Sequence, residues 1–468
     1  MSRLLDDLSA TLGERLRTDD EALARHRHDA WVLEELHDLE GRPASKPMAV
    51  VEAASTDDVV RTLRLCREHG VAVVPFGGGS GVCGAALPGS GAIVLSTRRM
   101  AGLVALDDVD MTACFRAGTM GIDAENRVQQ AGLSIGHWPQ SVELSTVGGW
   151  VATRASGQLS TAYGSIEDVL LALEVVLPDG SVLRTRETPR AAAGPDLRQL
   201  FLGSEGTLGV VTEVTFSLRP LPESSVGRAF HFASFAEGLE TIRHLVRAGW
   251  RPPVARLYDP RESRRHFREA SPKGRAMLLL LHEGAAAAVA VETAEVTRIC
   301  DDAGGAAADA ALVAQWMEGR NHVPSFRSFL EQGVIVDTIE VAATWRRVAN
   351  LYDRVTKSLA EVPGMLAATA HSSHSYRSGT NLYFSFAVKP ADPAQMGAAY
   401  DECWRRTMQA TLAAGGGIAH HHGIGRVRRN HLAGEIGETG VGLLRAIKHA
   451  LDPQNLLNPG SMLPPDPN

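Results

Sequence analysis

Cysteine is scarce and dispersed in this sequence. The 468 residues include five cysteines, an odd number, and none of them forms a CxxC pair: Cys66, Cys83, Cys114, Cys300 and Cys403. This pattern favours a reducing compartment. There is no run of about 18 apolar residues that could span a bilayer, and the N-terminus lacks the basic and apolar segments of a signal peptide. The sequence therefore predicts a cytoplasmic protein without a transmembrane segment.

Concentrated positive charge is also missing. Asp and Glu (54) outnumber Lys and Arg (47), the net charge is −7, and the basic residues are spread along the chain. Binding to nucleic acid needs clustered Lys and Arg, so nucleic acid is not an expected partner. The length predicts roughly two to four domains with a large buried core.

Hydrophobic periodicity divides the chain into four parts. Residues 1–46 form a helical lead-in that ends at "GRPASKP", and residues 47–222 begin with a strand, a helix N-capped by Thr56 and a second strand. Further short strands follow, including a hairpin that turns at Pro178-Asp179-Gly180. Residues 223–415 form a second domain, and residues 416–468 a C-terminal segment. Runs of strands between helices predict an α+β fold.

Three stretches carry chemical signals. "PFGGGSG" directly follows a strand, and its glycines can bring backbone N–H groups close to a phosphate, although a plain turn explains them equally well. In residues 139–170, small and hydroxyl residues crowd a segment whose composition indicates a loop, which suits contact with a flat ligand. "GSEGTLGVVTEV" is a glycine-rich turn that leads into a strand.

Together with two later motifs, these stretches resemble a known family. "PFGGGSG", "LSTVGGWVATRASG", "GPDLRQLFLGSEGTLGVVTEVTFSLRPLPE", "LYFSF" and "HHHGIGR" occur in that order. They resemble the vanillyl-alcohol oxidase and p-cresol methylhydroxylase superfamily, and within it the alkyldihydroxyacetonephosphate synthases and their bacterial FAD-linked oxidase-like relatives. The resemblance implies an α+β FAD-binding domain built from two subdomains, an α+β cap domain over the substrate, and a C-terminal segment that completes the flavin site.

The resemblance also assigns a set of cofactor-binding residues. They share small side chains, hydroxyl groups or positions in the glycine-rich turns: Pro75, Gly77, Gly78, Gly79, Ser80, Gly81, Ser141, Thr146, Gly148, Gly149, Thr153, Ser156, Glu205, Gly206 and Val211. Covalent members of the family commonly carry a histidine where Ser80 stands, so the FAD is expected to be noncovalent. Cys83 is close enough in sequence for a thioether link, but a buried neutral thiol is the preferred interpretation.

The three consecutive histidines of "HHHGIGR" first suggest a metal site. Neighbours in an extended chain point to opposite faces, so at most His420 and His422 share a side, and no HExxH motif is present. D-2-hydroxy-acid dehydrogenases of the superfamily use an HxGDGNLH motif and a glutamate for a metal. Tyr376, Tyr383 and His421 stand at the positions of those ligands, so no metal is expected.

The catalytic assignments follow from the synthase resemblance. Tyr383, His421 and His422 match residues on the substrate side of the flavin, where an imidazole with a pKa near neutrality can move a proton. His420 is interpreted as a structural hydrogen-bonding residue, and His137, His371 and His374 are left unassigned. Arg256 matches a synthase arginine directly, and Arg327 matches another if one residue is missing before Gly333. Either guanidinium suits a phosphate or carboxylate.

Three functional hypotheses remain, two of them enzymatic and one noncatalytic. The first is exchange of the acyl group of acyl-dihydroxyacetone phosphate for a fatty alcohol, with a flavin N5 adduct and no net redox change. The second is a D-2-hydroxy-acid or alcohol oxidase or dehydrogenase with His422 as the base. A noncatalytic flavin carrier is disfavoured, because it would not explain the tyrosine and histidines. The family suggests a homodimer and a small-molecule or lipid-like substrate, and the N-terminal helix leaves a peripheral membrane contact open.

Overall fold

The expected β-α-β unit forms the first layer of the computed structural model, which describes residues 2–43 and 46–465. Strands β2 (Ala49–Glu52) and β3 (Val73–Phe76) flank helix α4 (Thr56–Glu68), and both pair in parallel with β4 (Ile93–Ser96). Strand β1 (Leu16–Arg17) completes the order β1-β2-β4-β3. The cap prediction is wrong by one residue. Ser55 Oγ accepts from the Asp58 amide at 3.2 Å, and Asp58 accepts from the Ser55 amide at 3.1 Å.

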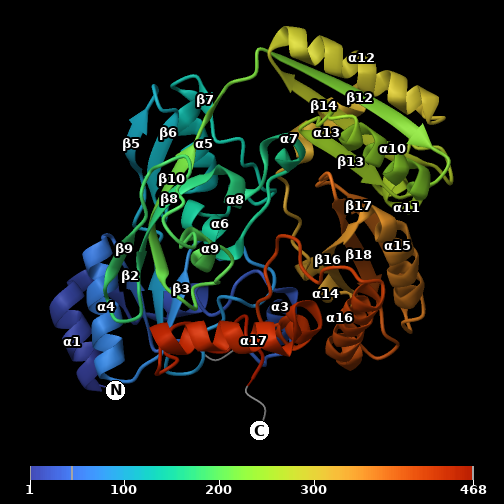
Figure 1. The fold of residues 1–468 in the computed structure, drawn as a ribbon. Coiled ribbons are helices and arrows are strands. Elements are labelled where there is room, and N and C mark those ends of the chain that lie inside the picture. Colours follow the sequence, from blue (N-terminus) through green and yellow to red (C-terminus); the bar gives the residue numbers. More distant parts are fainter. Residues whose placement is uncertain (1, 44–45, 466–468) are drawn as a thin grey trace.

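A second, antiparallel sheet lies beside the first (Figure 1). Its order is β5-β6-β10-β8-β9, from the strands β5 (Leu103–Asp107), β6 (Thr112–Arg116), β8 (Leu170–Val176), β9 (Val182–Arg184) and β10 (Val210–Ser217). The hairpin prediction is confirmed, because β8 pairs antiparallel with β9 across the Pro178-Asp179-Gly180 turn. Around this sheet lie α5 (Gly121–Gln129), α9 (Arg198–Phe201) and the paired short strands β7 (Leu133–Ser134) and β11 (Arg219–Pro220).

The segment of residues 139–170 is not the loop that its composition indicated. It contains three short helices: α6 (Val147–Thr153), α7 (Ser160–Tyr163) and α8 (Ile166–Val169). Val147, Trp150 and Val151 are buried in the core of the second sheet. Burial of these apolar side chains decides the local structure here, against the loop-like small and hydroxyl residues around them.

The N-terminal lead-in packs against both halves of the molecule. Leu4, Leu8 and Leu12 on α1 (Ser2–Leu12) are buried in the core around α4, so the apolar face of this helix is not available to a membrane. Two further helices follow, α2 (Asp20–Arg25) and α3 (Val32–Leu39), after the short 3-10 turn η1 (Gly13–Arg15). Leu36 of α3 is buried in the core of the second half.

The second half is built on one seven-stranded sheet in the order β15-β12-β14-β13-β17-β18-β16. Its strands are β12 (Ser224–Phe232), β13 (Val254–Tyr258), β14 (Ala276–Gly284), β15 (Ala306–Ala308), β16 (Ile335–Thr344), β17 (Met365–Ser372) and β18 (Gly379–Val388). Alternate residues of β14 enter different cores, with Leu278 and Leu280 in one and Met277 and Leu279 in the other. Both faces of the sheet are therefore covered.

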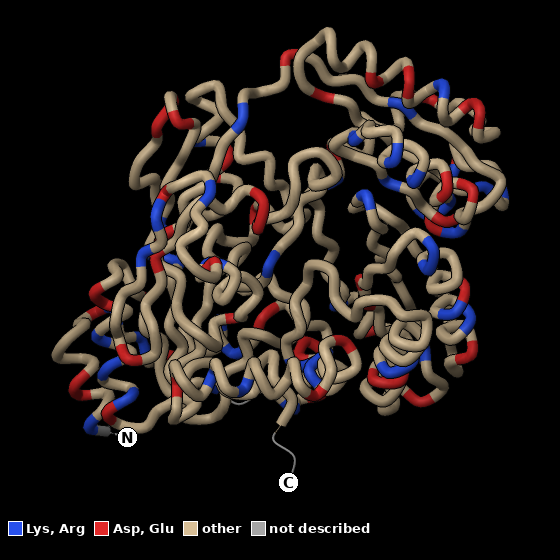
Figure 2. The backbone as a smooth tube through the Cα atoms, in the orientation of Figure 1, with Lys and Arg blue, Asp and Glu red and all other residues tan. Residues whose placement is uncertain are grey.

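Four long helices cover the outer face of this sheet (Figure 1). They are α10 (Phe235–Arg247), α12 (Ala286–Asp302), α15 (Trp345–Ala360) and α16 (Met396–Ala413), the last preceded by η2 (Pro393–Gln395). The shorter helices are α11 (Pro260–His266), α13 (Ala311–Gly319) and α14 (Arg327–Leu330). Among the described helices, none is both long and apolar enough to cross a membrane. Acidic and basic residues are interspersed in the view of Figure 2.

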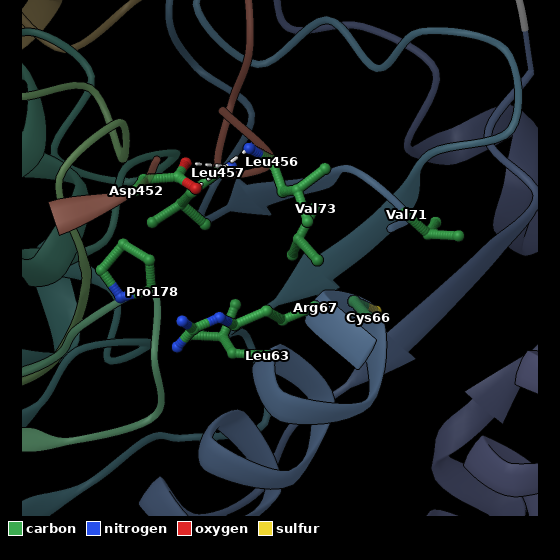
Figure 3. Close-up of a pocket in the computed structure, with 9 residues that line it drawn as sticks. All are labelled: Leu63, Cys66, Arg67, Val71, Val73, Pro178, Asp452, Leu456 and Leu457. Carbon is green, nitrogen blue, oxygen red and sulfur yellow. Dashed lines mark hydrogen bonds between the residues drawn. The ribbon is translucent and has the colours of Figure 1, made fainter. Parts of the chain in front are cut away.

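The C-terminal segment returns to the first sheet. After η3 (Arg429–His431), α17 (Leu432–Leu451) begins near α16 and runs along the bottom of Figure 1 under the first half. The chain then runs beside β3: the Val73 amide donates to Leu456 O, and the Asn458 amide donates to Val73 O, each at 2.8 Å. The pocket at this junction (Figure 3) has a volume of about 10 Å³, which is room for a water molecule only. The predicted boundaries at residues 46, 222 and 415 stay predictions.

Candidate functional site

The glycine loop after β3 packs directly against the second predicted cofactor stretch. A Cβ atom at Gly78 would lie 2.1 Å from Leu144 O, and one at Gly77 would lie 2.6 Å from Thr146 Oγ1. Gly79 has a φ of +71°, which a side chain would strain. Only glycine therefore allows this close approach. The sequence prediction had placed both stretches at the same cofactor, and the fold brings them together.

A cavity of about 260 Å³ opens beside the glycine loop. Its walls comprise Gly77, Gly78 and Gly79, with Phe76, Arg98 and five residues of the N-terminal lead-in, namely Arg25, His26, His28, Asp29 and Ala30. Two arginines beside exposed glycine backbone suit a diphosphate, so the residues present fit the FAD that the motifs imply. These N-terminal residues were not among the predicted cofactor-binding residues, because the helical pattern of residues 1–46 carries no cofactor motif.

Several predicted cofactor residues have local structural contacts. Thr146 Oγ1 caps α6 by accepting from the Gly149 amide at 3.2 Å, and Thr153 Oγ1 donates to Gly149 O at 2.9 Å. Ser156 Oγ lies 2.7 Å from Ser165 Oγ. Ser141 O accepts from Ser145 Oγ, and Val211 is buried in the second sheet. A Cβ atom on Gly148 would contact Ala117, and one on Gly206 would contact Pro75. Ser80 and Gly81 directly follow the three glycines.

Four polar side chains form a row across the seven-stranded sheet. Tyr258 on β13 pairs with His371 on β17, His371 pairs with Tyr383 on β18, and Tyr383 pairs with Glu340 on β16. Directly opposed residues point to the same face of a sheet, so the register places all four side chains together. The His371 and Tyr383 rings stack with centroids 4.7 Å apart. Tyr383 was predicted, whereas Glu340 was missed, because β16 carries a second acid, Asp337, and no local pattern distinguishes the two.

Two buried carboxylates hold the turn that contains the three histidines. Glu340 Oε1 accepts from the backbone amides of His420, His421 and His422 at 3.2, 3.0 and 2.7 Å. Its second oxygen forms an ion pair with Arg428, and both side chains are fully buried. Glu205 accepts from the Ile424 amide at 2.6 Å and the Gly425 amide at 2.9 Å. The carboxylate of Glu205 therefore binds the C-terminal turn.

The histidine rings are arranged differently from the extended-chain prediction, which is wrong. His420 Nδ1 lies 2.8 Å from His421 Nδ1, so these adjacent rings converge, because the turn around Glu340 is bent rather than extended. His420 Nε2 lies 2.8 Å from Tyr376 Oη, which agrees with a structural role for His420. Burial lowers the pKa of His420 to about 4, and burial also lowers the pKa values of His421 and His422. The expected pKa near neutrality is therefore wrong, because burial keeps these imidazoles neutral.

His374 joins this cluster, and its geometry bears on a metal. Ring nitrogens of His374, His420 and His421 lie within 4.8 Å of one another. However, both nitrogens of His420 are in hydrogen bonds, and His374 Nδ1 lies 2.6 Å from Ser160 Oγ. A catalytic zinc takes three protein ligands, and these hydrogen bonds leave fewer than three of the histidine rings with a free nitrogen. The expectation of no metal stays a prediction.

The structure separates the two predicted arginines. Arg256 on β13 donates to Tyr258 Oη and His371 Nε2, each at 2.7 Å, and so contacts two members of the row. Arg327 lies on α14, pairs with Glu331 at 3.2 Å, and has a side chain that is 55% exposed. None of its contacts within the described residues reaches Tyr383 or the histidines. The uncertain alignment before Gly333 explains why sequence matching gave the two arginines similar roles.

Comparison with known proteins agrees with these features. A family model described as an FAD binding domain matches residues 47–186, and one described as the C-terminal domain of FAD linked oxidases matches residues 221–462. An uncharacterized FAD-linked oxidoreductase, YgcU of Escherichia coli (strain K12), is 31% identical over 98% of this chain and 98% of its own. The alkyldihydroxyacetonephosphate synthase of Trypanosoma brucei brucei is 31% identical over 90% of this chain and 74% of its own.

Solved structures show the same fold. An alkyldihydroxyacetonephosphate synthase has a TM-score of 0.83 at 26% identity, covering 98% of this chain and 85% of its own. A p-cresol methylhydroxylase with bound substrate has a TM-score of 0.77 at 17% identity, covering 100% of this chain and 98% of its own. The fold class predicted from the sequence is confirmed. The chain belongs to the FAD-linked oxidase family, has the p-cresol methylhydroxylase type of fold, and uses FAD as its cofactor.

Proposed function

We propose that the protein catalyses a reaction like that of alkyldihydroxyacetonephosphate synthase, in which a fatty alcohol replaces the acyl group of acyl-dihydroxyacetone phosphate. The observation that carries the proposal is the set of side chains contributed by the row, by Arg256 bonded to it, and by the turn that contains the three histidines. Arg256, Tyr383 and His422 provide an anion-binding group, a proton donor and a proton acceptor within one connected cluster. Similarity to the Trypanosoma brucei brucei synthase supports the same assignment.

The chain's own groups have states that suit these roles. Burial raises the pKa of Tyr383 to about 12, so its hydroxyl stays protonated and can donate a hydrogen bond to the departing carboxylate. His422 Nδ1 lies 3.5 Å from Glu340 Oε2, and this carboxylate favours a proton on Nδ1. The Nε2 atom then has a lone pair that can take the proton from C1 of the substrate. Arg256 would hold the phosphate.

The cofactor has a defined place in this proposal. The residues that would hold its diphosphate are Gly77, Gly78 and Gly79, with Arg25 and Arg98 across the cavity. When bound, FAD supplies a conjugated ring that can accept and return an electron pair. We expect the binding to be noncovalent, because Ser80 has no ring nitrogen and burial raises the pKa of the Cys83 thiol well above its usual value. Cytoplasmic location and homodimerisation stay predictions. Contact with a membrane surface also stays a prediction, but it would not involve the apolar face of α1, because Leu4, Leu8 and Leu12 are buried.

An anaerobic substrate test distinguishes this reaction from oxidation. The FAD-loaded protein is mixed with D-lactate, glycolate and D-2-hydroxyglutarate, and separately with acyl-dihydroxyacetone phosphate and hexadecanol. We expect an ether product without lasting bleaching of the flavin absorbance. Bleaching by a hydroxy acid would instead establish the alternative, a D-2-hydroxy-acid oxidase or dehydrogenase.

Two substitutions test the catalytic assignments. Tyr383→Phe and His422→Ala should keep bound FAD but lower turnover about 100-fold or more, because each removes one group that moves a proton. Tyr163→Phe is the matched control, since it removes the hydroxyl of a half-buried tyrosine that donates at 2.8 Å to Glu283, a residue outside the row. If Tyr383→Phe and His422→Ala both lose FAD, the two residues hold the cofactor and do not perform the chemistry.

A further inference from the structure

Two buried side chains, Glu262 and His371, lie behind Arg256. Glu262 is on α11, a helix that begins after Asp259, whose side chain accepts from the Glu262 amide at 2.8 Å. His371 is on β17, and Glu262 Oε1 lies 3.0 Å from His371 Nδ1. His371 Nε2 in turn lies 2.7 Å from Arg256 Nη2. Glu262 and His371 are 1% and 4% exposed, so water does not compete for these contacts.

The position of each proton in this chain of contacts follows from the donor at its end. A guanidinium has only N–H donors, so His371 Nε2 has to accept and therefore carries no proton. The remaining ring proton is on Nδ1 and is donated to Glu262. Burial and the Arg256 charge lower the pKa of His371 to about 4, which keeps the ring neutral. Burial alone would raise the pKa of Glu262, but contacts with His371, His266 and Arg265 lower it, which keeps a carboxylate there.

Arg256 is consequently held in one orientation. Its Nε donates to Tyr258 Oη at 2.7 Å, and its Cζ lies 5.1 Å and 5.7 Å from the ring centres of Tyr258 and Trp316. Within the described residues, Nη1 has no hydrogen-bond partner. The guanidinium is therefore fixed through Nε and Nη2 and keeps N–H groups for a ligand, a geometry that suits an oxyanion with two acceptor atoms.

We propose that Glu262 and His371 are positioning residues that orient Arg256 as a receptor for an anionic group of the substrate. The ionised carboxylate of Glu262 keeps the proton of His371 on Nδ1. His371 Nε2 is then unprotonated and accepts the hydrogen bond from Arg256. This inference rests on the proposed function, in which Arg256 holds the substrate phosphate. His371 also stacks on Tyr383, so the same ring supports two groups of the row.

The chain contains a matched pair that serves as the control. His282 on β14 lies 3.2 Å from Glu292 on α12, its ring is fully buried, and its Nε2 has no partner among the described residues. If the His371–Glu262 pair were purely structural, replacing its glutamate should change stability, as replacing Glu292 should, and should leave phosphate binding unchanged. Only the pair behind Arg256 should change anion binding.

The test measures binding of inorganic phosphate to the FAD-loaded protein by titration calorimetry, with melting temperature and FAD content recorded for each variant. Arg256→Ala, Glu262→Gln and His371→Leu should each weaken phosphate binding about tenfold or more, the loss expected for one misplaced charge-assisted contact. The glutamine amide can donate to Nδ1 as well as accept from it, so Glu262→Gln no longer fixes the tautomer and permits a proton on Nε2 facing Arg256. Glu292→Gln should bind phosphate like the unsubstituted protein.

Conservative variants separate positioning from folding. Glu262→Asp keeps a carboxylate, and His371→Gln presents an amide oxygen to Arg256, so both should retain most of the affinity even where their melting temperatures fall. With the acyl substrate, Glu262→Gln should raise KM more than it lowers kcat. If Arg256→Ala binds phosphate normally, the proposed function of Arg256 is wrong. If only Arg256→Ala loses binding and His371→Leu stays within about twofold of the parent, Arg256 keeps its role and the positioning proposal is wrong.

Discussion

Replacing Glu340 by glutamine should destabilise the protein through a single unpaired charge. Glu340 and Arg428 are both 0% exposed, and Glu340 is the carboxylate that pairs with this guanidinium. Glutamine keeps an oxygen for the three histidine amides but presents a neutral amide to Arg428. Removing one partner of a buried ion pair costs about 3 to 5 kcal/mol, because the remaining charge stays desolvated. We therefore expect Glu340→Gln to lower the free energy of unfolding by about that amount.

A double-mutant cycle identifies the cause of this loss. Arg428→Met removes the other charge, and the double variant buries no charge at either position. Its loss should be smaller than the sum of the two single losses by about 2 kcal/mol or more. The measurement is the urea midpoint of the first unfolding transition, followed by tryptophan fluorescence and by release of FAD. A cost below about 1 kcal/mol for Glu340→Gln, or additive single losses, would refute the reasoning.

Three further predictions follow from local geometry. Gly78→Ala should abolish FAD binding, since its Cβ would lie 2.1 Å from Leu144 O, whereas Gly89→Ala, which meets nothing within 4 Å, should keep the flavin absorbance. Ser55→Ala should cost about 1 kcal/mol in urea unfolding by removing the α4 cap, and no measurable change would contradict the capping assignment. Burial raises the pKa of Asp29 to about 7 from 3.8, so the native carboxyl keeps its proton where the unfolded one loses it, and stability falls as pH rises between these values. Asp29→Asn should remove this pH dependence, so at pH 8 its free energy of unfolding in urea titrations should exceed that of the parent by up to about 4 kcal/mol. Parallel pH profiles of the unfolding free energy for the two proteins would contradict this prediction.

Local sequence patterns determined those helices and hairpins that are stabilised mainly by residues close together in the sequence. The turn residues Pro178-Asp179-Gly180 predicted the β8–β9 hairpin, and the segment "TDDVVRTLRLCREHG" predicted a helix where α4 forms. The order of the glycine and histidine motifs indicated the family, the cofactor and Tyr383. Patterns failed where burial overrode composition, as in α6, where Val147, Trp150 and Val151 enter the core of the second sheet.

The tertiary structure alone decided which side chains meet in the site. The row of Tyr258, His371, Tyr383 and Glu340 exists because β13, β17, β18 and β16 are adjacent in one register, and no short-range pattern encodes the order of strands. The same long-range pairing brings Glu340 beneath the three histidine amides and leaves Arg327 on an exposed helix. Burial then lowers the pKa values of the histidines, because the cost of desolvating a charge depends on the surrounding fold. The sequence by itself thus determined the fold family and its cofactor, and the packing of distant strands decided which side chains lie together in the candidate site and in which direction burial shifts their pKa values.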